Sequence, residues 1–359
     1  MPAQTFKISY LSSEDSGNTA WQCPSNIALI KYWGKRDHQL PSNPSLSITL
    51  LNSCTETSIE YEYIEVLTAP GIHFTYDDTV DKSFEKRVTG FIENMILDIP
   101  VLHKMRLNIR SKNNFPHSAG IASSASAFGS LALCLCSIEA QVMGSAEGSA
   151  DFFRKASYLA RLGSGSACRS IYGGYVVWGE DEDHADFSNL FAQPFPFDIH
   201  PVFTEIQDTI LIVSSDKKPL SSSDGHNLMK THPYAFCRYN QGRSNHAELI
   251  NVLQHGDMDG FIKIVENEAL SIHGLLLSSD GGPILLKPES LQIINKVIGF
   301  RRETHVPVCF TIDAGPNIHL IYPLQYKNQI IPFIQDELLQ HCENSKFIDD
   351  QIGSGPIKL

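Results

Sequence analysis

The chain has 359 residues and a formal net charge of −12, and 42% of its residues are hydrophobic while 19% are charged. These proportions are typical of a globular protein, and the length favours two domains over a single core. Because the charge is negative and no long basic run occurs, nucleic acid and anionic membrane surfaces are not expected as main partners. A local basic pocket remains compatible with this composition.

The sequence shows no sign of export or of a metal centre. Residues 1–14 are polar and mixed, unlike a signal peptide, and we expect no apolar run to approach the roughly 18 to 20 residues that span a bilayer. The eight cysteines and 14 histidines show no zinc-binding spacing. We therefore predict a cytoplasmic protein with reduced, buried thiols and no metal-binding cluster.

Hydrophobic periodicity predicts both strands and helices in the first half of the chain. Alternating apolar residues indicate half-buried strands, and apolar residues at every third or fourth position indicate helices. We expect strands at 57–64, 72–76, 105–109 and 171–178, and helices at 84–97, 123–140 and 152–162. The helix at 123–140 is mostly apolar, so we expect it to be central and buried.

The segment 181–200 has no clear period and separates two parts of the chain. It is acidic and then rich in Pro and Phe, and we place a domain boundary at its end, which gives domains 1–200 and 201–359. Strands and helices are interleaved without a strict alternation, which predicts an α+β fold in two parts. In the second part we expect strands at 209–214, 306–312 and 318–322, and helices at 226–239, 245–255, 258–277, 288–304 and 324–341.

The segment Asn114–Ser126 leads through small residues into the predicted helix at 123–140. Small side chains let backbone N–H groups and Ser hydroxyls approach a ligand, and the positive end of a helix dipole favours an anion there. The alternative is an ordinary helix cap provided by Ser123 or Ser124. No lysine follows Gly120 as in a P-loop, so a nucleotide site at this position would be built differently.

Basic residues mark two further candidate anion sites. Lys31 and Lys35 lie in an aromatic and apolar segment, where a buried lysine needs an anion, although both could instead reach solvent. The segment 163–170 alternates Gly and Ser before Arg169, which fits a backbone nest with a bidentate anion contact. A helix C-cap with a tight turn is the alternative for Gly163.

Two polar turns in the second half are also candidates. Asp313 follows a predicted strand and precedes a Gly-Pro turn, so its carboxylate suits a general base or an orienting group, unless it caps its own turn. The loop 217–225 is polar and could cover an anionic site, although taken alone it fits a solvated loop better.

Together, these segments resemble the diphosphomevalonate decarboxylases of the GHMP kinase superfamily. The resemblance implies an N-terminal GHMP domain with a left-handed βαβ unit, a C-terminal ferredoxin-like α+β domain, and an active site in the cleft between them. The segments that carry it are Asn26-Ile-Ala-Leu-Ile-Lys-Tyr-Trp-Gly-Lys-Arg-Asp37, Asn113-Asn-Phe-Pro116, Ala122-Ser-Ser-Ala-Ser126, Ser164-Gly-Ser-Ala-Cys-Arg-Ser170, Asp313-Ala-Gly-Pro-Asn317 and Gly353-Ser-Gly-Pro356.

The resemblance implies an ATP-dependent decarboxylase of the mevalonate pathway of isoprenoid biosynthesis. Mevalonate 5-diphosphate would be phosphorylated on its 3-hydroxyl, and loss of that phosphate and of carbon dioxide would form isopentenyl diphosphate beside ADP. Such chemistry needs an aligned hydroxyl and neutralised phosphate charge. Mg²⁺ would be carried by ATP with few protein ligands, which agrees with the absence of a metal cluster in the sequence.

The resemblance also assigns roles to individual residues. Asp313 would contact the 3-hydroxyl, Lys31 would keep that carboxylate ionised by its nearby charge, and Arg169 would hold the substrate carboxylate. The implied substrate contacts are Tyr32, Lys35, Ser164, Ser166, Arg169, Ser221 and Ser222. The implied ATP contacts are Asn114, Pro116, Gly120, Ala122, Ser123, Ser124 and Ser126.

Departures from the family pattern leave loop closure and ATP geometry open. His117 stands where Thr is usual, His226 stands where Met is common, and the loop 217–225 is one residue longer than in some relatives. The alternatives are a decarboxylase of mevalonate 5-phosphate or the 3,5-bisphosphate, a mevalonate 3-kinase, and a non-catalytic nucleotide-binding module. The resemblance further implies a homodimer.

Overall fold

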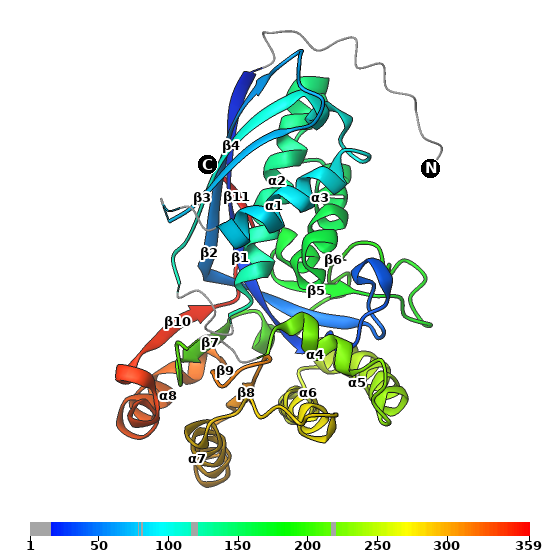
Figure 1. Cartoon of the computed structure of the whole chain (residues 1–359). Coiled ribbons are helices and arrows are strands. Elements are labelled where there is room, and N and C mark those ends of the chain that lie inside the picture. Colours follow the sequence, from blue (N-terminus) through cyan, green and yellow to red (C-terminus); the bar gives the residue numbers. More distant parts are fainter. Residues whose placement is uncertain (1–15, 78, 80–81, 116–120, 217–219) are drawn as a thin grey trace.

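The protein has an α+β architecture built on two sheets (Figure 1). The computed structural model describes residues 16–77, 79, 82–115, 121–216 and 220–359. A seven-stranded sheet has the strand order β11-β1-β2-β4-β3, with β5 paired to β2 and β6 paired to β5, and a four-stranded sheet has the order β10-β7-β9-β8. The predicted fold class is therefore confirmed.

The seven-stranded sheet is organised by two long strands, β1 and β2, which pair antiparallel from Ser16↔Glu62 to Ile30↔Leu46. Residues 55–63 of β2 pair with β4, and residues 45–48 pair with β5. The parallel strands β3 and β4 are joined through α1, which forms the expected βαβ unit. The strands are β1 (Ser16–Ile30), β2 (Ser45–Tyr63), β3 (Gly71–Tyr76), β4 (Met105–Asn113), β5 (Tyr175–Trp178), β6 (Gln193–Pro194) and β11 (Ile357–Lys358).

One face of this sheet is covered by α1 (Lys82–Met95), α2 (Ser123–Met143) and α3 (Ala150–Gly163) (Figure 1). The α3 helix begins where the Ser149 side chain accepts a hydrogen bond from Phe152 N–H, and α2 ends at Gly144 in the left-handed conformation, with φ of 65°. The start of α3 and the end of α2 therefore carry residue types that favour helix termini.

The α2 helix corrects one expectation about apolar runs. It is long and apolar enough to cross a membrane by length and composition, whereas the sequence was expected to hold no such run. However, 78% of its most apolar window is buried within the protein. It is the central, buried helix that the periodicity predicted, because its apolar surface packs against β1, β2 and α3.

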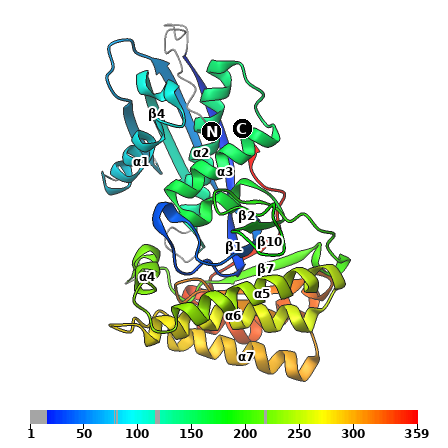
Figure 2. The same ribbon diagram turned by 90° about the vertical axis from the view of Figure 1, so that its right-hand side faces the viewer.

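The four-stranded sheet carries a layer of helices on one face, with α5, α6 and α7 side by side (Figures 1 and 2). Its strands are β7 (Ile206–Leu211), β8 (Cys309–Thr311), β9 (Ile318–Pro323) and β10 (Phe347–Gln351). The helices are α4 (Ser222–Leu228), α5 (Ala235–His255), α6 (Met258–Ser278), α7 (Pro288–Thr304) and α8 (Lys327–Phe333), the last followed by a π-helical turn at Ile334–Leu338. Short 3-10 turns lie at Asp37–Gln39, Pro100–Lys104, Gly165–Ile171, Pro201–Phe203, Leu324–Tyr326, Leu339–His341 and Glu343–Ser345.

Several predicted elements were wrong in extent. The helix expected at 226–239 and the one at 245–255 are replaced by a short α4 and a continuous α5. Gly242 lies within α5 and packs closely on Asn43, whose side-chain nitrogen would lie 2.8 Å from an added Cβ. The last helix was expected to run to residue 341, but α8 ends at Phe333 and continues only as π and 3-10 turns.

The end of the chain ties the two sheets together. The Asp350 carboxylate on β10 accepts hydrogen bonds from the backbone N–H groups of Leu51, Asn52 and Ser53 at 3.0, 2.8 and 2.8 Å. The chain then returns to the seven-stranded sheet as β11. One buried cluster also contains apolar side chains from both sheets, among them Ile27 and Ile210. The division at residue 200 therefore stays a prediction.

Candidate active site

A cavity of about 510 Å³ lies where the end of β1, the start of α2, the 3-10 turn Gly165–Ile171, α4 and the turn after β8 meet. Its described lining contains four basic side chains and one carboxylate, Asp313. A wall with this charge balance favours a polyanionic ligand of small-molecule size. The basic residues are Lys31, Lys35, Arg87 and Arg169.

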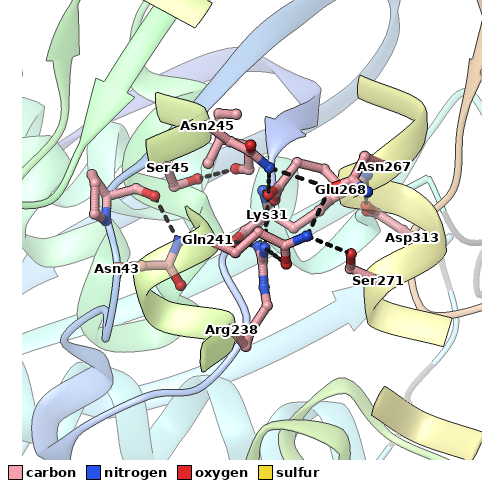
Figure 3. Close-up of polar contacts among 12 residues, drawn as sticks. Lys31, Asn43, Ser45, Arg238, Gln241, Asn245, Asn267, Glu268, Ser271 and Asp313 are labelled. Atoms are coloured by element: carbon pink, nitrogen blue, oxygen red, sulfur yellow. Dashed lines mark hydrogen bonds and ion pairs between the residues drawn. The ribbon is translucent and has the colours of Figure 1, made fainter. Parts of the chain in front are cut away.

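The cavity brings Lys31 and Asp313 together although 282 residues separate them. Lys31 Nζ lies 2.9 Å from Asp313 Oδ1, and the side chains are 2% and 28% exposed (Figure 3). Lys31 follows the last residue of β1, and Asp313 lies two residues beyond β8. The buried ammonium is thus paired with the one carboxylate of the described lining, which makes the alternative that Lys31 reaches solvent wrong.

The main chain on both sides of this pair is held by α6. Lys31 N–H donates to Glu268 Oε2 at 2.8 Å, and His273 Nε2 donates to the main-chain oxygen of Asp313 at 3.1 Å. Gly315 N–H also donates to that oxygen, at 2.7 Å, and closes the tight turn predicted from the sequence. Neither Glu268 nor His273 was singled out by the sequence, because single polar residues in an apolar helix give no signal of their partners.

Arg169 lies buried in the wall beside Ser45 and Asn26. Its Nη1 donates to Ser45 Oγ at 2.7 Å and its Nε donates to Asn26 Oδ1 at 3.3 Å, while the guanidinium lies 5.8 Å from the Trp178 ring. Burial lowers the pKa of Arg169. Asn26 in turn donates to Ser170 Oγ and the Ser166 carbonyl, so it orients the whole 3-10 turn.

An aromatic group forms another part of the wall around His226. Its ring lies 4.4 Å from that of Tyr32 and 5.1 Å from that of Trp33, and Gly34 N–H donates to its Nδ1 at 3.1 Å. Burial, together with the charges of Lys35 and Arg169, lowers the pKa of His226 to about 3. The ring is therefore neutral with its proton on Nε2.

Tyr32 and Lys35 are held near this group. Tyr32 Oη donates to the Gln39 carbonyl at 3.0 Å, and burial raises the pKa of Tyr32. Lys35 Nζ donates to Gln39 Oε1 at 3.2 Å, and burial and the nearby charge of Lys230 lower the pKa of Lys35. Both side chains line the cavity, as does Gln39, which the sequence did not mark.

The start of α2 presents an uncapped helix terminus at the cavity. Its N-cap residue is Ala122, at φ of 46°, and no side chain among the described residues caps it, so the alternative of a cap by Ser123 or Ser124 is wrong. Ala122 and Ser124 line the cavity, and Ser124 Oγ lies 3.2 Å from Ser164 Oγ, which links this helix to the Gly-Ser segment. Free N–H groups at such a terminus favour an anion.

Three other predicted phosphate contacts, Asn114, Ser123 and Ser126, are not part of the described lining. Ser126 is buried with its Oγ 2.6 Å from Thr55 Oγ1, and Asn114 bonds the backbone of Cys54 and Asn52. Both stabilise the approach to α2 rather than its ligand-facing end. Ser123 lies on the first turn outside the described lining. The predicted contacts Pro116 and Gly120 lie outside the described residues.

The Gly-Ser segment and α4 contribute the remaining predicted residues. Ser164 and Ser166 line the cavity from the 3-10 turn, and Ser221 and Ser222 line it from the start of α4. The Ser221 hydroxyl caps α4 by accepting from Asp224 N–H at 3.1 Å, so its oxygen already has a partner. Residues 217–219 of the same loop, and the departure at His117, lie outside the described residues.

Arg87 on α1 was missed, because it stands in a mixed-charge run that is typical of a solvated helix face. No group of three or more His, Cys, Asp or Glu side chains able to hold a metal ion occurs among the described residues. With Asp313 as the one described lining carboxylate, the site fits a divalent cation that arrives on phosphate oxygens.

Known proteins resemble the chain over most of its length. The profile of the diphosphomevalonate decarboxylase-like N-terminal domain matches residues 23–189, and that of the mevalonate 5-diphosphate decarboxylase C-terminal domain matches residues 209–355. The diphosphomevalonate decarboxylase of Aspergillus fumigatus is 31% identical over 325 residues, which cover 86% of this chain and 77% of the relative. That of Rattus norvegicus is 31% identical over 313 residues, 82% of this chain and 74% of the relative.

Solved structures agree with these sequence matches. The crystal structure of mevalonate diphosphate decarboxylase from Staphylococcus aureus superposes with a TM-score of 0.81 at 28% identity, over 96% of this chain and 98% of that one. A complex of MDDEF with MVAPP, AMPPCP and magnesium has a TM-score of 0.81 at 26% identity, over 96% of this chain and 99% of that one.

Proposed function

The chain belongs to the diphosphomevalonate decarboxylase family, and on that premise we propose that its cavity binds mevalonate 5-diphosphate with ATP and Mg²⁺. The products are isopentenyl diphosphate, ADP, phosphate and carbon dioxide. The observation that carries the proposal is the buried Lys31–Asp313 pair at 2.9 Å, in a cavity with Arg169 on its wall.

Asp313 acts on the 3-hydroxyl of the substrate. Its carboxylate accepts the hydroxyl proton or orients the hydroxyl for attack on the γ-phosphoryl group. Lys31 keeps negative charge on that carboxylate and neutralises charge on the transferring group. If Asp313 acts as the orienting group, it remains ionised, and its negative charge then stabilises the positive charge that develops at C3 as phosphate leaves.

Arg169 distinguishes a decarboxylase from a simple kinase, because it holds the substrate carboxylate that is lost as carbon dioxide. Ser45 and Asn26 already bind two of its nitrogens, so the planar guanidinium is fixed before substrate arrives. A fixed donor costs little entropy on binding and aligns the C–C bond that breaks.

The two ends of the cavity divide the phosphates between them. The substrate diphosphate lies against Tyr32, Lys35, Arg87, Ser164, Ser166, Ser221 and Ser222. The nucleotide phosphates lie at the start of α2, against Ala122 and Ser124, with Ser123 on the same first turn outside the described lining, while Asn114 and Ser126 support that helix start. Mg²⁺, bound to phosphate oxygens, supplies charge neutralisation for phosphoryl transfer.

The test is carbon dioxide release by the purified protein with ATP and Mg²⁺. We expect mevalonate 5-diphosphate to react far faster than mevalonate 5-phosphate or the 3,5-bisphosphate. Equal or reversed rates would refute the substrate assignment, ADP formation without carbon dioxide would identify a 3-kinase, and nucleotide binding without turnover would identify a non-catalytic module.

The assembly and compartment of the protein are part of the same proposal. A homodimer follows from the family resemblance, and sedimentation velocity measures it directly. A cytoplasmic location is supported by the eight cysteines, all of which are free and seven of which are buried. Cell fractionation tests the location; recovery with a membrane or an organelle would contradict it.

A further inference from the structure

We propose that the buried ion pair of Arg238 and Glu268 is a positioning device for the catalytic Lys31. The inference rests on the proposed function, because it assigns Lys31 to the reaction. Neither Arg238 nor Glu268 belongs to the described cavity lining. Their effect on catalysis is therefore exerted through Lys31 and not through contact with substrate.

The ion pair holds both main-chain groups of Lys31 (Figure 3). Glu268 Oε2 accepts from Lys31 N–H at 2.8 Å, and Arg238 Nη2 donates to the Lys31 carbonyl at 3.3 Å. The guanidinium also binds both carboxylate oxygens of Glu268, with Nη1 2.7 Å from Oε1. The backbone at Lys31 is thus clamped between an anion and a cation.

Amide side chains complete the clamp. Asn43 Nδ2 donates to the Lys31 carbonyl at 3.2 Å, and Asn245 Nδ2 donates to Glu268 Oε1 at 2.7 Å. Gln241 Oε1 accepts from Arg238 Nη1 at 3.0 Å. Hydrogen bonds fix the geometry of a buried charge pair, so this set leaves Lys31 little freedom to shift.

Burial makes stability a poor explanation for this pair. Glu268 is 0% exposed and Arg238 is 2% exposed, so both charges have lost their water. Replacing such a pair with apolar residues is often neutral or stabilising, because the desolvation cost offsets the attraction. A role in orienting Lys31 explains why a charged pair occupies this buried position, because its hydrogen bonds require one specific geometry.

The position of Glu268 on α6 strengthens the assignment. Five residues further along the same helix, His273 binds the main-chain oxygen of Asp313. One rigid helix therefore holds Lys31, which comes from the seven-stranded sheet, and Asp313, which comes from the four-stranded sheet. This arrangement fixes the position of Lys31 relative to Asp313 although the two residues follow strands of different sheets.

The first experiment compares Glu268→Gln with the wild type. The amide keeps the size of the side chain but leaves Arg238 without a counter-charge and places an NH₂ group against its guanidinium. We expect kcat per folded protein to fall about 10- to 100-fold, as for a displacement of about 1 Å, with KM for ATP changed less than about twofold. Arg238→Lys replaces the two guanidinium nitrogens that bind Glu268 and the Lys31 carbonyl with one ammonium group. If Glu268→Gln does not fold, we expect Arg238→Lys to lower kcat with a similarly small change in KM.

A control variant separates positioning from general destabilisation. Glu139→Gln breaks the 2.6 Å Lys155–Glu139 pair between α2 and α3, outside the described lining, and we expect it to preserve kcat. Unchanged kcat in Glu268→Gln, or an equal loss in the control, overturns the proposal.

Hydrogen exchange gives a readout that does not depend on activity. We expect the Lys31 amide of the full-length protein to exchange at least 10-fold faster in Glu268→Gln and to keep its wild-type rate in Glu139→Gln. Faster exchange in a protein without decarboxylase activity would contradict the proposed function and leave the clamp intact. An unchanged exchange rate in Glu268→Gln would overturn the clamp.

Discussion

His226 makes the stability of the fold depend on pH in a predictable direction. The ring is 7% exposed, accepts a hydrogen bond from Gly34 N–H, and has its pKa lowered to about 3 by burial and by the charges of Lys35 and Arg169. In the unfolded chain a histidine titrates near its ordinary pKa of about 6.5. Between these two pKa values, the unfolded state therefore binds a proton at His226 that the folded state does not bind.

The sign and size follow from proton linkage. The stability associated with the neutral ring is complete above the unfolded pKa and declines as the pH falls toward the folded pKa. With pKa values of about 6.5 and about 3, the free energy of unfolding decreases by about 2 kcal/mol between about pH 7 and about pH 5. Other groups add their own dependence, so the contribution of His226 appears as a difference between two proteins.

The assay is urea unfolding of the wild type and His226→Gln at both pH values. We expect the wild type to lose about 2 kcal/mol more than the variant over this interval, because glutamine does not titrate. His255→Gln, which replaces an exposed histidine on α5, is the matched control and is expected to keep the wild-type dependence. Equal losses in the wild type and His226→Gln would refute the reasoning.

Three other substitutions, and a fourth as a control, test the site and the contact between the sheets. Asp313→Asn is expected to lower kcat by orders of magnitude while ATP still binds in calorimetry, and near-normal turnover would remove Asp313 from the mechanism. Arg169→Lys loses the planar contact to Ser45 and Asn26, so kcat/KM for mevalonate 5-diphosphate should fall about 100-fold; retention of activity would count against its role. Gly353→Ala puts a Cβ 2.5 Å from the Leu50 carbonyl and should lower the free energy of unfolding by about 1–3 kcal/mol in urea titrations. Gly274→Ala, in an open helical position, should raise it by up to about 1 kcal/mol, and a loss of equal size in both would contradict the packing argument.

The local elements with strong periodicity were predictable because they depend on neighbours in the chain. The buried α2 and the helices α6 and α7 appear within a few residues of their expected ends, as does β3. No part of β1 (Ser16–Ile30) was predicted as a strand, because its mixed polar and apolar residues become a strand only through pairing with β2. Strand pairing depends on partners that are distant in sequence.

The residues of the site also divide into those that local sequence identifies and those that only the fold brings to the site. Sequence motifs and their family resemblance were enough to select Lys31, Arg169 and Asp313, because each stands in a recognisable segment. Glu268 and Arg238 carry no such signal, and only the fold brings them to Lys31, which lies 237 residues from Glu268. The residue types that suit each motif to its chemistry can therefore be identified from a short segment of sequence. The distances and burial that make it act as one site depend on contacts that only the tertiary structure forms.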